Sequence, residues 1–385
     1  FYFMFRKIFI KLAVIIFLTP IASADESYSN YKKYSLTETT FKLEKIAQDL
    51  NFPWALTFLD KSNLLLTEKN GGLLKINIKN GEKEKIKHNI QHLPYLGGHQ
   101  GGLLDTYFHS NDNFIYFSYS HKFNEDSNLS STAIARGNLV NGEITNLQVL
   151  LIAKPPLPSK KHFGSRISIK GDTLFASFGE RDEGMIAQDP SMHPGSIIRI
   201  KTNGSIPKDN PKFTGKDSWL PEIYTIGVRN PQGITISPYN NKIIFSNHGP
   251  RGGDHIGEVE AGANYGWKDV AWGGTEYSFL RIGDKAFKAK YKKPLKTWVP
   301  SMAISSIQFY QGNTFPEWQG DLIICSLNGQ SLLRLDFEDN QILGEEIIFK
   351  NKIGRIRDFE INKEGDIFLI SDSPQSSLWK LTKNK

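Results

Sequence analysis

Short apolar runs dominate the chain beyond residue 24, and patterns with helical periodicity are scarce. The runs are separated by Gly, Asn and Asp, a distribution typical of β-strands joined by tight turns. Six segments share one form, in which a strand, a tight turn and a second apolar strand ending in small or polar residues follow one another. These segments begin at Trp54, Gly101, Ser165, Gln232, Ser305 and Arg357.

The six segments recur at roughly 50 to 70 residues, a spacing in the range of propeller blades that carry insertions. A further apolar strand often follows the hairpin, as at 72–78, 196–202, 331–337 and 377–383. We therefore predict an all-β fold, a six-bladed β-propeller with four-stranded antiparallel blades. A β-sandwich would not call for six similar units. No linker divides residues 25–385, which we expect to form a single catalytic domain.

The N-terminal 24 residues have the pattern of an export signal. Arg6, Lys7 and Lys11 precede an apolar run over 12–18, and Ala-Ser-Ala at 22–24 offers a small-residue cleavage site. The run is too short to span a bilayer, so an uncleaved anchor is the weaker alternative. We predict a signal peptide over 1–24, a periplasmic protein and no stable membrane insertion.

Charge and cysteine content narrow the function further. The formal net charge of +7 includes three basic residues of the signal segment, and the remainder is too small to indicate nucleic-acid binding. A basic run from Lys285 to Lys296 is either a solvated loop or a docking patch for an acidic partner. Cys325, the only cysteine, excludes an internal disulfide and is expected to be a buried thiol.

Polar residues immediately precede each of the six hairpins. Because equivalent positions of propeller blades lie at the same height around the axis, these residues should converge at one mouth of the central channel. Three arginines in one pocket indicate a ligand with several carboxylates or phosphates. His162 is the best candidate for a base, with a structural histidine as the alternative. The converging residues are Pro53, Trp54, Gln100, His162, Arg229, Asn230, Ser301, Arg355 and Arg357.

Common phosphate, zinc and hydrolase motifs do not account for this pocket. The sequence has no GxxxxGK[ST] loop and no GxSxG elbow. His248 and His255 are close in sequence, but their spacing matches no standard zinc pattern. Calcium is more plausible, because the glycine-rich stretch 246–267 offers the backbone carbonyls and carboxylates that this ion accepts.

Longer motifs carry a resemblance to a known family. They are "HQGGLLD" at 99–105, "HFGSRI" at 162–167, "AQDPSMHPGSIIRI" at 187–200, "IPKDNPKF" at 206–213, "PEIYTIGVRNPQGI" at 221–234, "HGPRGGD" at 248–254, "GANYGW" at 262–267 and "GRIRD" at 354–358. The chain resembles the soluble aldose sugar dehydrogenases of the glucose/sorbosone dehydrogenase family, which depend on pyrroloquinoline quinone (PQQ). The resemblance also implies a six-bladed propeller.

The resemblance assigns roles to individual residues. It implies that His162 takes the proton of the anomeric hydroxyl while hydride passes to C5 of PQQ, yielding a lactone. Arg229 would stabilise charge on the quinone oxygen, and the carbonyls of Gly249 and Pro250 would bind a catalytic calcium. Gln188 and Lys161 are expected to face the aldose substrate. The expected cofactor contacts are Gln100, Arg229, Asn230, Tyr277, Ser301, Arg355 and Arg357.

Three positions depart from the family pattern. His255 stands where relatives carry a Glu that binds a second calcium together with the Tyr265 carbonyl, and Glu258 or Glu260 are candidates to compensate. Asn328 replaces a lysine that contacts the cofactor. Lys161 precedes His162 and is expected to change sugar preference or to favour acidic sugars. Its charge is also expected to lower the pKa of His162 by repulsion.

The sequence thus predicts a PQQ- and calcium-dependent aldose dehydrogenase. A periplasmic electron acceptor, with a cytochrome as one candidate, would complete the reaction. Two alternatives stay open at this point. One is a calcium-dependent propeller lactonase, which the arginine-rich ring disfavours. The other is a propeller that binds a sugar or a partner without chemistry, which the changes at His255 and Asn328 favour.

Overall fold

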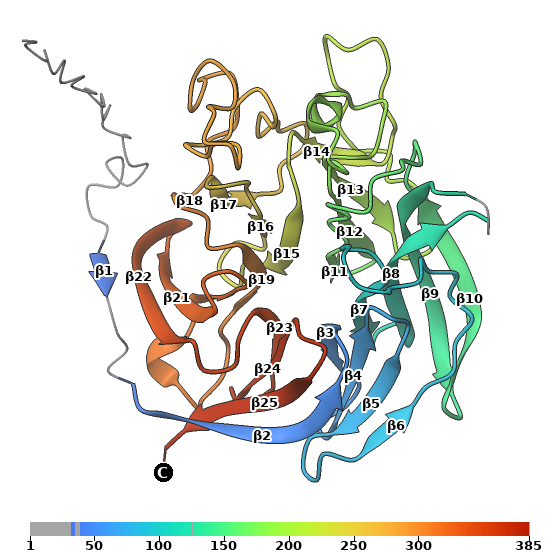
Figure 1. Cartoon of the computed structure of the whole chain (residues 1–385), viewed down its shortest axis with the longest axis vertical. Helices are drawn as coiled ribbons and strands as arrows, with labels where there is room; N and C mark the ends of the chain where they lie inside the picture. Colours follow the sequence, from blue (N-terminus) through green and yellow to red (C-terminus); the bar gives the residue numbers. More distant parts are fainter. Residues whose placement is uncertain (1–31, 35–38, 125–126, 385) are drawn as a thin grey trace, which may run out of the picture.

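Six small sheets stand in a ring around a central axis, as Figure 1 shows for the computed structural model. The structure describes residues 32–34, 39–124 and 127–384. Each sheet is a blade of four antiparallel strands, and one blade gains a fifth, parallel strand. The predicted all-β six-bladed propeller is confirmed.

The first three blades follow one another along the chain. The first contains β3 (Pro53–Phe58), β4 (Asn63–Glu68), β5 (Leu73–Asn77) and β6 (Lys83–Lys85). The second contains β7 (Leu103–His109), β8 (Phe114–Lys122), β9 (Ser130–Val140) and β10 (Glu143–Ile152). The third contains β11 (Ile167–Lys170), β12 (Thr173–Phe178), β13 (Ser196–Lys201) and β14 (Ile223–Ile226).

The other three blades complete the ring. The fourth contains β15 (Pro231–Ile236), β16 (Ile243–Asn247), β17 (Asp254–Glu258) and β18 (Lys296–Trp298). The fifth contains β19 (Ile304–Phe309), β20 (Leu322–Ser326), β21 (Ser331–Glu338), β22 (Gln341–Lys350) and the added β1 (Lys32–Tyr34). The sixth contains β23 (Ile356–Ile361), β24 (Ile367–Ser371), β25 (Ser376–Lys383) and β2 (Phe41–Leu50).

The sixth blade joins segments from distant parts of the sequence. Its outer strand, β2, pairs antiparallel with β25, from Phe41 opposite Lys383 to Leu50 opposite Ser376. This pairing closes the ring, because the N-terminal strand completes the sheet that the C-terminal strands begin (Figure 1).

The hydrophobic core lies between neighbouring blades. One cluster packs Tyr116 and Ile134 of the second blade against Ile167, Leu174 and Ile198 of the third. The second strands of the hairpins are almost entirely buried, as in β20, because both of their faces meet adjacent sheets. Continuous apolar runs therefore replace simple alternation in these strands. Cys325 in β20 is a buried free thiol, as expected.

Regular helix is limited to short turns in the described residues, namely the 3₁₀ segments η2 (Gly184–Gln188) and η3 (Pro316–Trp318). None of the helices found in the described ranges is long and apolar enough to cross a membrane. The predicted signal peptide over 1–24 lies outside the described residues.

Candidate active site

A cavity of about 530 Å³ opens at one end of the central axis, and all six blades contribute to its wall. A second cavity of about 240 Å³ shares Gln100, Lys161, His162, Arg229 and Tyr277 with it. The two spaces therefore form one site with a large and a small compartment, and His162 lies on their common wall.

The structure brings most of the predicted site residues together here. Pro250 lines the small compartment. The predicted residues on the wall of the large compartment are Gln100, Lys161, His162, Arg229, Asn230, Tyr277, Arg355 and Arg357.

Two expected contacts lie elsewhere in the described part of the chain. Ser301 lines neither compartment. Its hydroxyl donates a hydrogen bond to the carboxylate of Asp254 at 2.8 Å. The Gln188 amide is likewise engaged outside both compartments, donating to the Trp267 carbonyl at 2.7 Å and exchanging hydrogen bonds with Asn264. In this arrangement Ser301 and Gln188 stabilise neighbouring segments of the chain and do not line the cavity.

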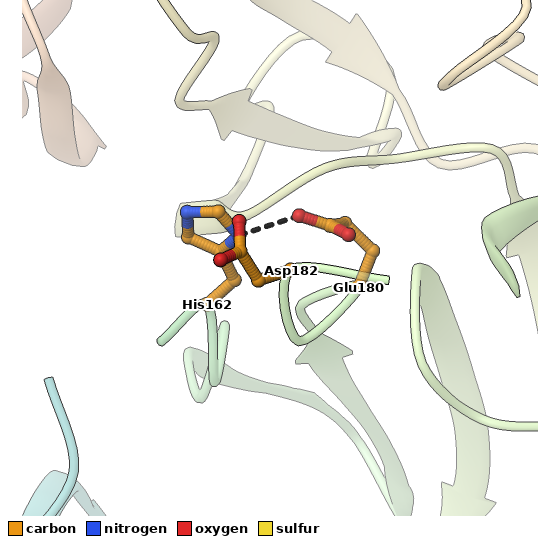
Figure 2. A group of neighbouring side chains, drawn as sticks. All are labelled: His162, Glu180 and Asp182. Carbon is orange, nitrogen blue, oxygen red and sulfur yellow. Dashed lines mark hydrogen bonds and ion pairs between the residues drawn. The ribbon is translucent and has the colours of Figure 1, made fainter. Parts of the chain in front are cut away.

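His162 is held by a carboxylate that the sequence reasoning did not identify. Its Nδ1 lies 2.5 Å from Oε1 of Glu180, while the other oxygen of Glu180 accepts the backbone N–H of Gly184 at 2.5 Å. Figure 2 shows the imidazole and this carboxylate pointing toward one another, with Asp182 beside the ring. Glu180 therefore fixes the imidazole with a proton on Nδ1 and leaves Nε2 as the acceptor.

Backbone geometry sets this pair in place. His162 adopts a left-handed φ of 50°, and its N–H donates to Oε1 of Gln100 at 2.8 Å. Gly179 precedes Glu180, and a side chain there would meet the His162 carbonyl oxygen at 2.0 Å from its Cβ. Only glycine permits so close an approach of the two loops.

His162 is neutral at physiological pH. Burial lowers its pKa most, and the charge of Arg229 adds to this, whereas the hydrogen bond that the ring donates to Glu180 acts in the opposite direction. Lys161, which the sequence suggested, is not among the main causes of this pKa shift. Its ammonium instead pairs with Asp182 at 2.9 Å on the exposed side of the site.

His162, Glu180 and Asp182 also form a cluster with the composition of a metal site, since one ligand atom from each lies within 4.8 Å of the others. The close contact between His162 Nδ1 and Glu180 already uses both facing atoms. We therefore interpret the cluster as a base with its orienting acids.

A group of cations also lines the large compartment. Arg357 donates to Asp372 at 2.6 Å, and the Lys69 ammonium lies 2.7 Å from the other oxygen of the same carboxylate. Lys69 also faces the rings of Phe52 and Tyr95 at 5.0 and 4.6 Å. One carboxylate thus orients two buried cations toward the cavity.

The charges of this group influence each other. Burial and the nearby Arg357 lower the pKa of Lys69 to about 8. Burial acts to raise the pKa of Asp372, but Arg357 and Lys69 hold it below its ordinary value. Among the described residues, Nε of Arg357 is buried without a hydrogen-bond partner. The compartment therefore offers excess positive charge to an anion.

Asn328, where the expected lysine is missing, does not line the large compartment, although its neighbour Leu327 does. Lys69 supplies a buried ammonium on the same wall, from the turn after β4. The position of Lys69 could have been found from the sequence, because it directly follows the second strand of the first hairpin.

The predicted calcium ligands lie next to Arg229. The Gly249 carbonyl accepts hydrogen bonds from Arg229 at 3.1 Å and from Nδ1 of His248 at 2.8 Å. Burial and the Arg229 charge lower the pKa of His248 to about 3, so this ring is neutral. Carbonyl oxygens of this kind suit calcium, although an ion at Gly249 would have to replace at least one of these hydrogen bonds.

A buried histidine occupies the position where the family pattern predicts a ligand of the second calcium. His255 is buried, and burial lowers its pKa to about 4. Its Nδ1 bonds the Gly253 carbonyl at 3.0 Å, and its ring stacks on that of Tyr265 with centroids 5.6 Å apart. Neutral imidazole is a poor ligand for this hard ion.

The neighbouring groups do not restore a second calcium site. The Tyr265 carbonyl accepts the indole N–H of Trp272 at 2.9 Å. Glu258 pairs with Lys242 at 2.8 Å, and Glu260 pairs with Lys292 at 2.6 Å. Both candidate replacement acids are thus neutralised by lysines, and the residues present do not fit a second calcium.

The site combines a neutral, carboxylate-oriented imidazole with a cationic cavity, an arrangement that suits proton transfer beside an anionic ligand. Comparison with known proteins specifies the class. Residues 50–380 match the model of the glucose/sorbosone dehydrogenase family. The chain belongs to this family and is an oxidoreductase that acts on sugars.

A curated relative and a solved structure, both from Escherichia coli, match about nine-tenths of the chain. Aldose sugar dehydrogenase YliI of strain K12 is 31% identical over 353 residues, spanning 89% of this chain and 93% of the relative. The crystal structure of the soluble aldose sugar dehydrogenase in its apo form superposes with a TM-score of 0.82 at 30% identity, covering 90% and 100%.

A further relative is a quinoprotein by name. Quinoprotein glucose dehydrogenase B of Acinetobacter calcoaceticus is 29% identical over 287 residues, or 68% of this chain and 59% of the relative. The family, the propeller and the resemblance to PQQ-dependent sugar dehydrogenases are confirmed.

Proposed function

We propose that this protein oxidises aldoses at C1 to lactones, using PQQ as the hydride acceptor and His162 as the base. The observation that carries the proposal is the neutral His162, which Glu180 orients on the wall shared by a small compartment and a cationic one. The aldose would occupy the small compartment, and PQQ the large one.

The large compartment suits a planar tricarboxylate. Arg355, Arg357 and Lys69 offer cations to its carboxylates, and guanidinium forks pair with such groups in a bidentate manner. Gln100, Asn230 and Tyr277 would contact the remaining edge of the cofactor.

The proton steps belong to the chain's own residues. Because Glu180 holds the proton of Nδ1, Nε2 of His162 can accept the proton of the anomeric hydroxyl. Glu180 then stabilises the resulting imidazolium. Bound PQQ supplies the electrophilic carbonyl carbon that takes the hydride. Arg229 lies on the wall of both compartments, where its guanidinium would stabilise developing negative charge.

Calcium is part of the proposal at the carbonyls of Gly249 and Pro250. Its support is the donor chemistry and the position of Pro250 on the small compartment. Lys161 would contact the sugar, and its pairing with Asp182 offsets the charge that would otherwise favour acidic sugars. Gln188 and Ser301 are not assigned contacts, because they bond to neighbouring segments of the chain.

The remaining expectations complete this picture. We place the enzyme in the periplasm, with 1–24 as its signal peptide and 25–385 as the catalytic domain, on the strength of the sequence pattern alone. Electrons would pass from the cofactor to a periplasmic acceptor. The lactonase alternative has less support, because arginines and a lysine surround the axial cavity where a carboxylate-bound metal would be needed.

Reconstitution tests the proposal directly. Purified protein is loaded with PQQ and calcium, and reduction of a dye is followed across a panel of aldoses. Activity that requires both additions is expected, and no activity with any aldose would overturn the proposal. His162→Ala should lose turnover while still binding PQQ in an absorbance titration. Lactone hydrolysis without PQQ would favour the lactonase instead.

A further inference from the structure

An exposed apolar patch lies at the edge of the active site. Three large apolar side chains that lie close together in the chain are about two-thirds exposed. They are Tyr277 (66%), Phe279 (67%) and Leu280 (68%). We call these three residues the rim patch. They belong to the long connection between β17 and β18, which projects beyond the ring of blades (Figure 1). Clustered exposed apolar side chains beside a functional site are typical of interaction surfaces.

The rim patch is continuous with the site and is held in shape. Tyr277 lines both compartments, so the patch begins at their opening. Thr275 and Arg281 form a β-bridge around it, and the backbone N–H of Glu276 bonds the Leu280 carbonyl at 2.8 Å. The Glu276 carboxylate also pairs with Lys268 at 2.5 Å. The exposed side chains are thus presented on a bonded turn.

Positive charge surrounds this turn. The Arg251 guanidinium lies 3.5 Å from the centroid of the Phe279 ring, and Arg281 and Lys285, which follow shortly after in the chain, are exposed. Residues 268–293 contain seven Lys and Arg against three acidic residues. A partner that covers the apolar turn would therefore have to carry negative charge around its own contact surface.

The basic run from Lys285 to Lys296 acts partly as a brace. Lys288 pairs with Asp269 and Asp284 at 2.7 and 2.5 Å, and Lys290 pairs with Asp269 at 3.1 Å. These pairs tie the run to the loop that carries the rim patch. The attraction for an acidic partner then comes from the excess of cations around the turn.

We propose that the rim patch is the docking surface for an acidic electron-carrier protein that accepts electrons from the reduced enzyme. The proposal rests on the proposed function and adds the partner and its binding surface. Aromatic side chains and arginine are the residues favoured in interface cores. The cationic surroundings would accelerate encounter with an acidic carrier. Because such encounters are brief, a small contact area suffices.

The electron count requires repeated docking. Oxidation of one aldose to its lactone removes two electrons and two protons. A haem carrier accepts one electron as its ferric iron becomes ferrous, so two carriers are reduced for each sugar and two protons pass to solvent. A surface that binds and releases quickly meets this requirement better than a permanent complex.

The test compares two acceptors on the PQQ- and calcium-loaded enzyme. One acceptor is a small acidic cytochrome, and the other is the dye dichlorophenolindophenol. For the double variant Arg281→Glu/Lys285→Glu, kcat/KM for the cytochrome should fall about tenfold at low salt, and the salt dependence should weaken. Leu280→Ser should also lower kcat/KM for the cytochrome. Dye reduction should be unchanged in both variants.

A single charge reversal away from the rim patch provides the control. Lys363→Glu lies in the turn between β23 and β24, at the opposite end of β23 from the cavity-lining Arg357. It should leave cytochrome reduction unchanged. Equal cytochrome rates in the rim variants and the wild type would overturn the proposal, as would rim-dependent binding to anionic lipid vesicles without a change in cytochrome rate. Failure of the wild type to reduce the dye would instead refute the proposed function.

Discussion

His162 and Glu180 form a buried pair in which Nδ1 and a carboxylate oxygen lie 2.5 Å apart. The two residues are 18 positions apart and come from different connections of the third blade. The pair defines which imidazole nitrogen carries the proton. Without it, burial alone would still keep the ring neutral but would not fix its tautomer or orientation.

Glu180→Gln is therefore expected to reduce kcat about a hundredfold, which is within the usual contribution of an oriented base. PQQ affinity should change little, since Glu180 lines only the small compartment. The acidic limb of the pH–rate profile reports protonation of His162. Because Glu180 acts to raise the pKa of His162, the variant's limb should move to lower pH.

Steady-state kinetics between pH 4 and 8 with a dye acceptor would measure both effects. Glu183→Gln is the matched control, because Glu183 is exposed and does not line the small compartment. An unchanged kcat in Glu180→Gln would remove Glu180 from its role. A loss of kcat without any shift of the acidic limb would indicate a merely structural effect.

Lys69 is expected to bind a cofactor carboxylate. Lys69→Gln should weaken PQQ binding about tenfold, the loss expected for one charge-assisted hydrogen bond. The pKa of Lys69 is about 8 in the free enzyme, so PQQ affinity should decline as pH rises through this value and the ammonium is lost. Lys69→Arg, which stays charged, should retain affinity and lose this pH dependence.

Absorbance titration of the apo protein with PQQ between pH 6.5 and 9.5 provides the readout, independently of turnover. Lys75→Gln, at an exposed pair with Glu84 in the same blade, is the control. Equal affinities for the Lys69→Gln and wild-type proteins across this range would exclude the contact.

The sequence predicted the propeller and most of the cavity because both follow from the repeat. Equivalent positions of the six repeated hairpins lie at the same height around the axis, which we call the repeat register. Six hairpins gave the blades, and residues preceding their first strands line the cavity. The missed residues, Lys69, Glu180 and Asp372, follow the second strands β4, β12 and β24. In an antiparallel hairpin, the end of the second strand lies beside the start of the first, so the same register argument applies to both.

Other features could not follow from register. Ser301 precedes its hairpin as the others do, yet its hydroxyl donates a hydrogen bond to Asp254 at the start of β17. The pairing of Lys161 with Asp182 depends on two loops whose backbones adopt left-handed conformations. Local side-chain partners of this kind are decided by tertiary packing, which repeat spacing does not describe.

His255 makes a further prediction about metal dependence. The buried, neutral ring stacks on Tyr265 and bonds the Gly253 carbonyl, so it packs this region without an ion. His255→Glu would place a carboxylate in the same buried position. Without a metal, burying this charge should cost about 2 kcal/mol of folding stability, since the carboxylate must be desolvated or protonated.

Calcium should offset this loss, because the new carboxylate is a suitable ligand for it. Thermal unfolding with calcium or with a chelator would measure the effect. The increase in Tm on adding calcium should be larger in His255→Glu than in the wild type, whose increase would come from the Gly249–Pro250 site alone. His255→Gln, similar in size and uncharged, should not gain this extra increase. If the wild type shows the same calcium-dependent increase as His255→Glu, then the imidazole does not replace an ion at this position.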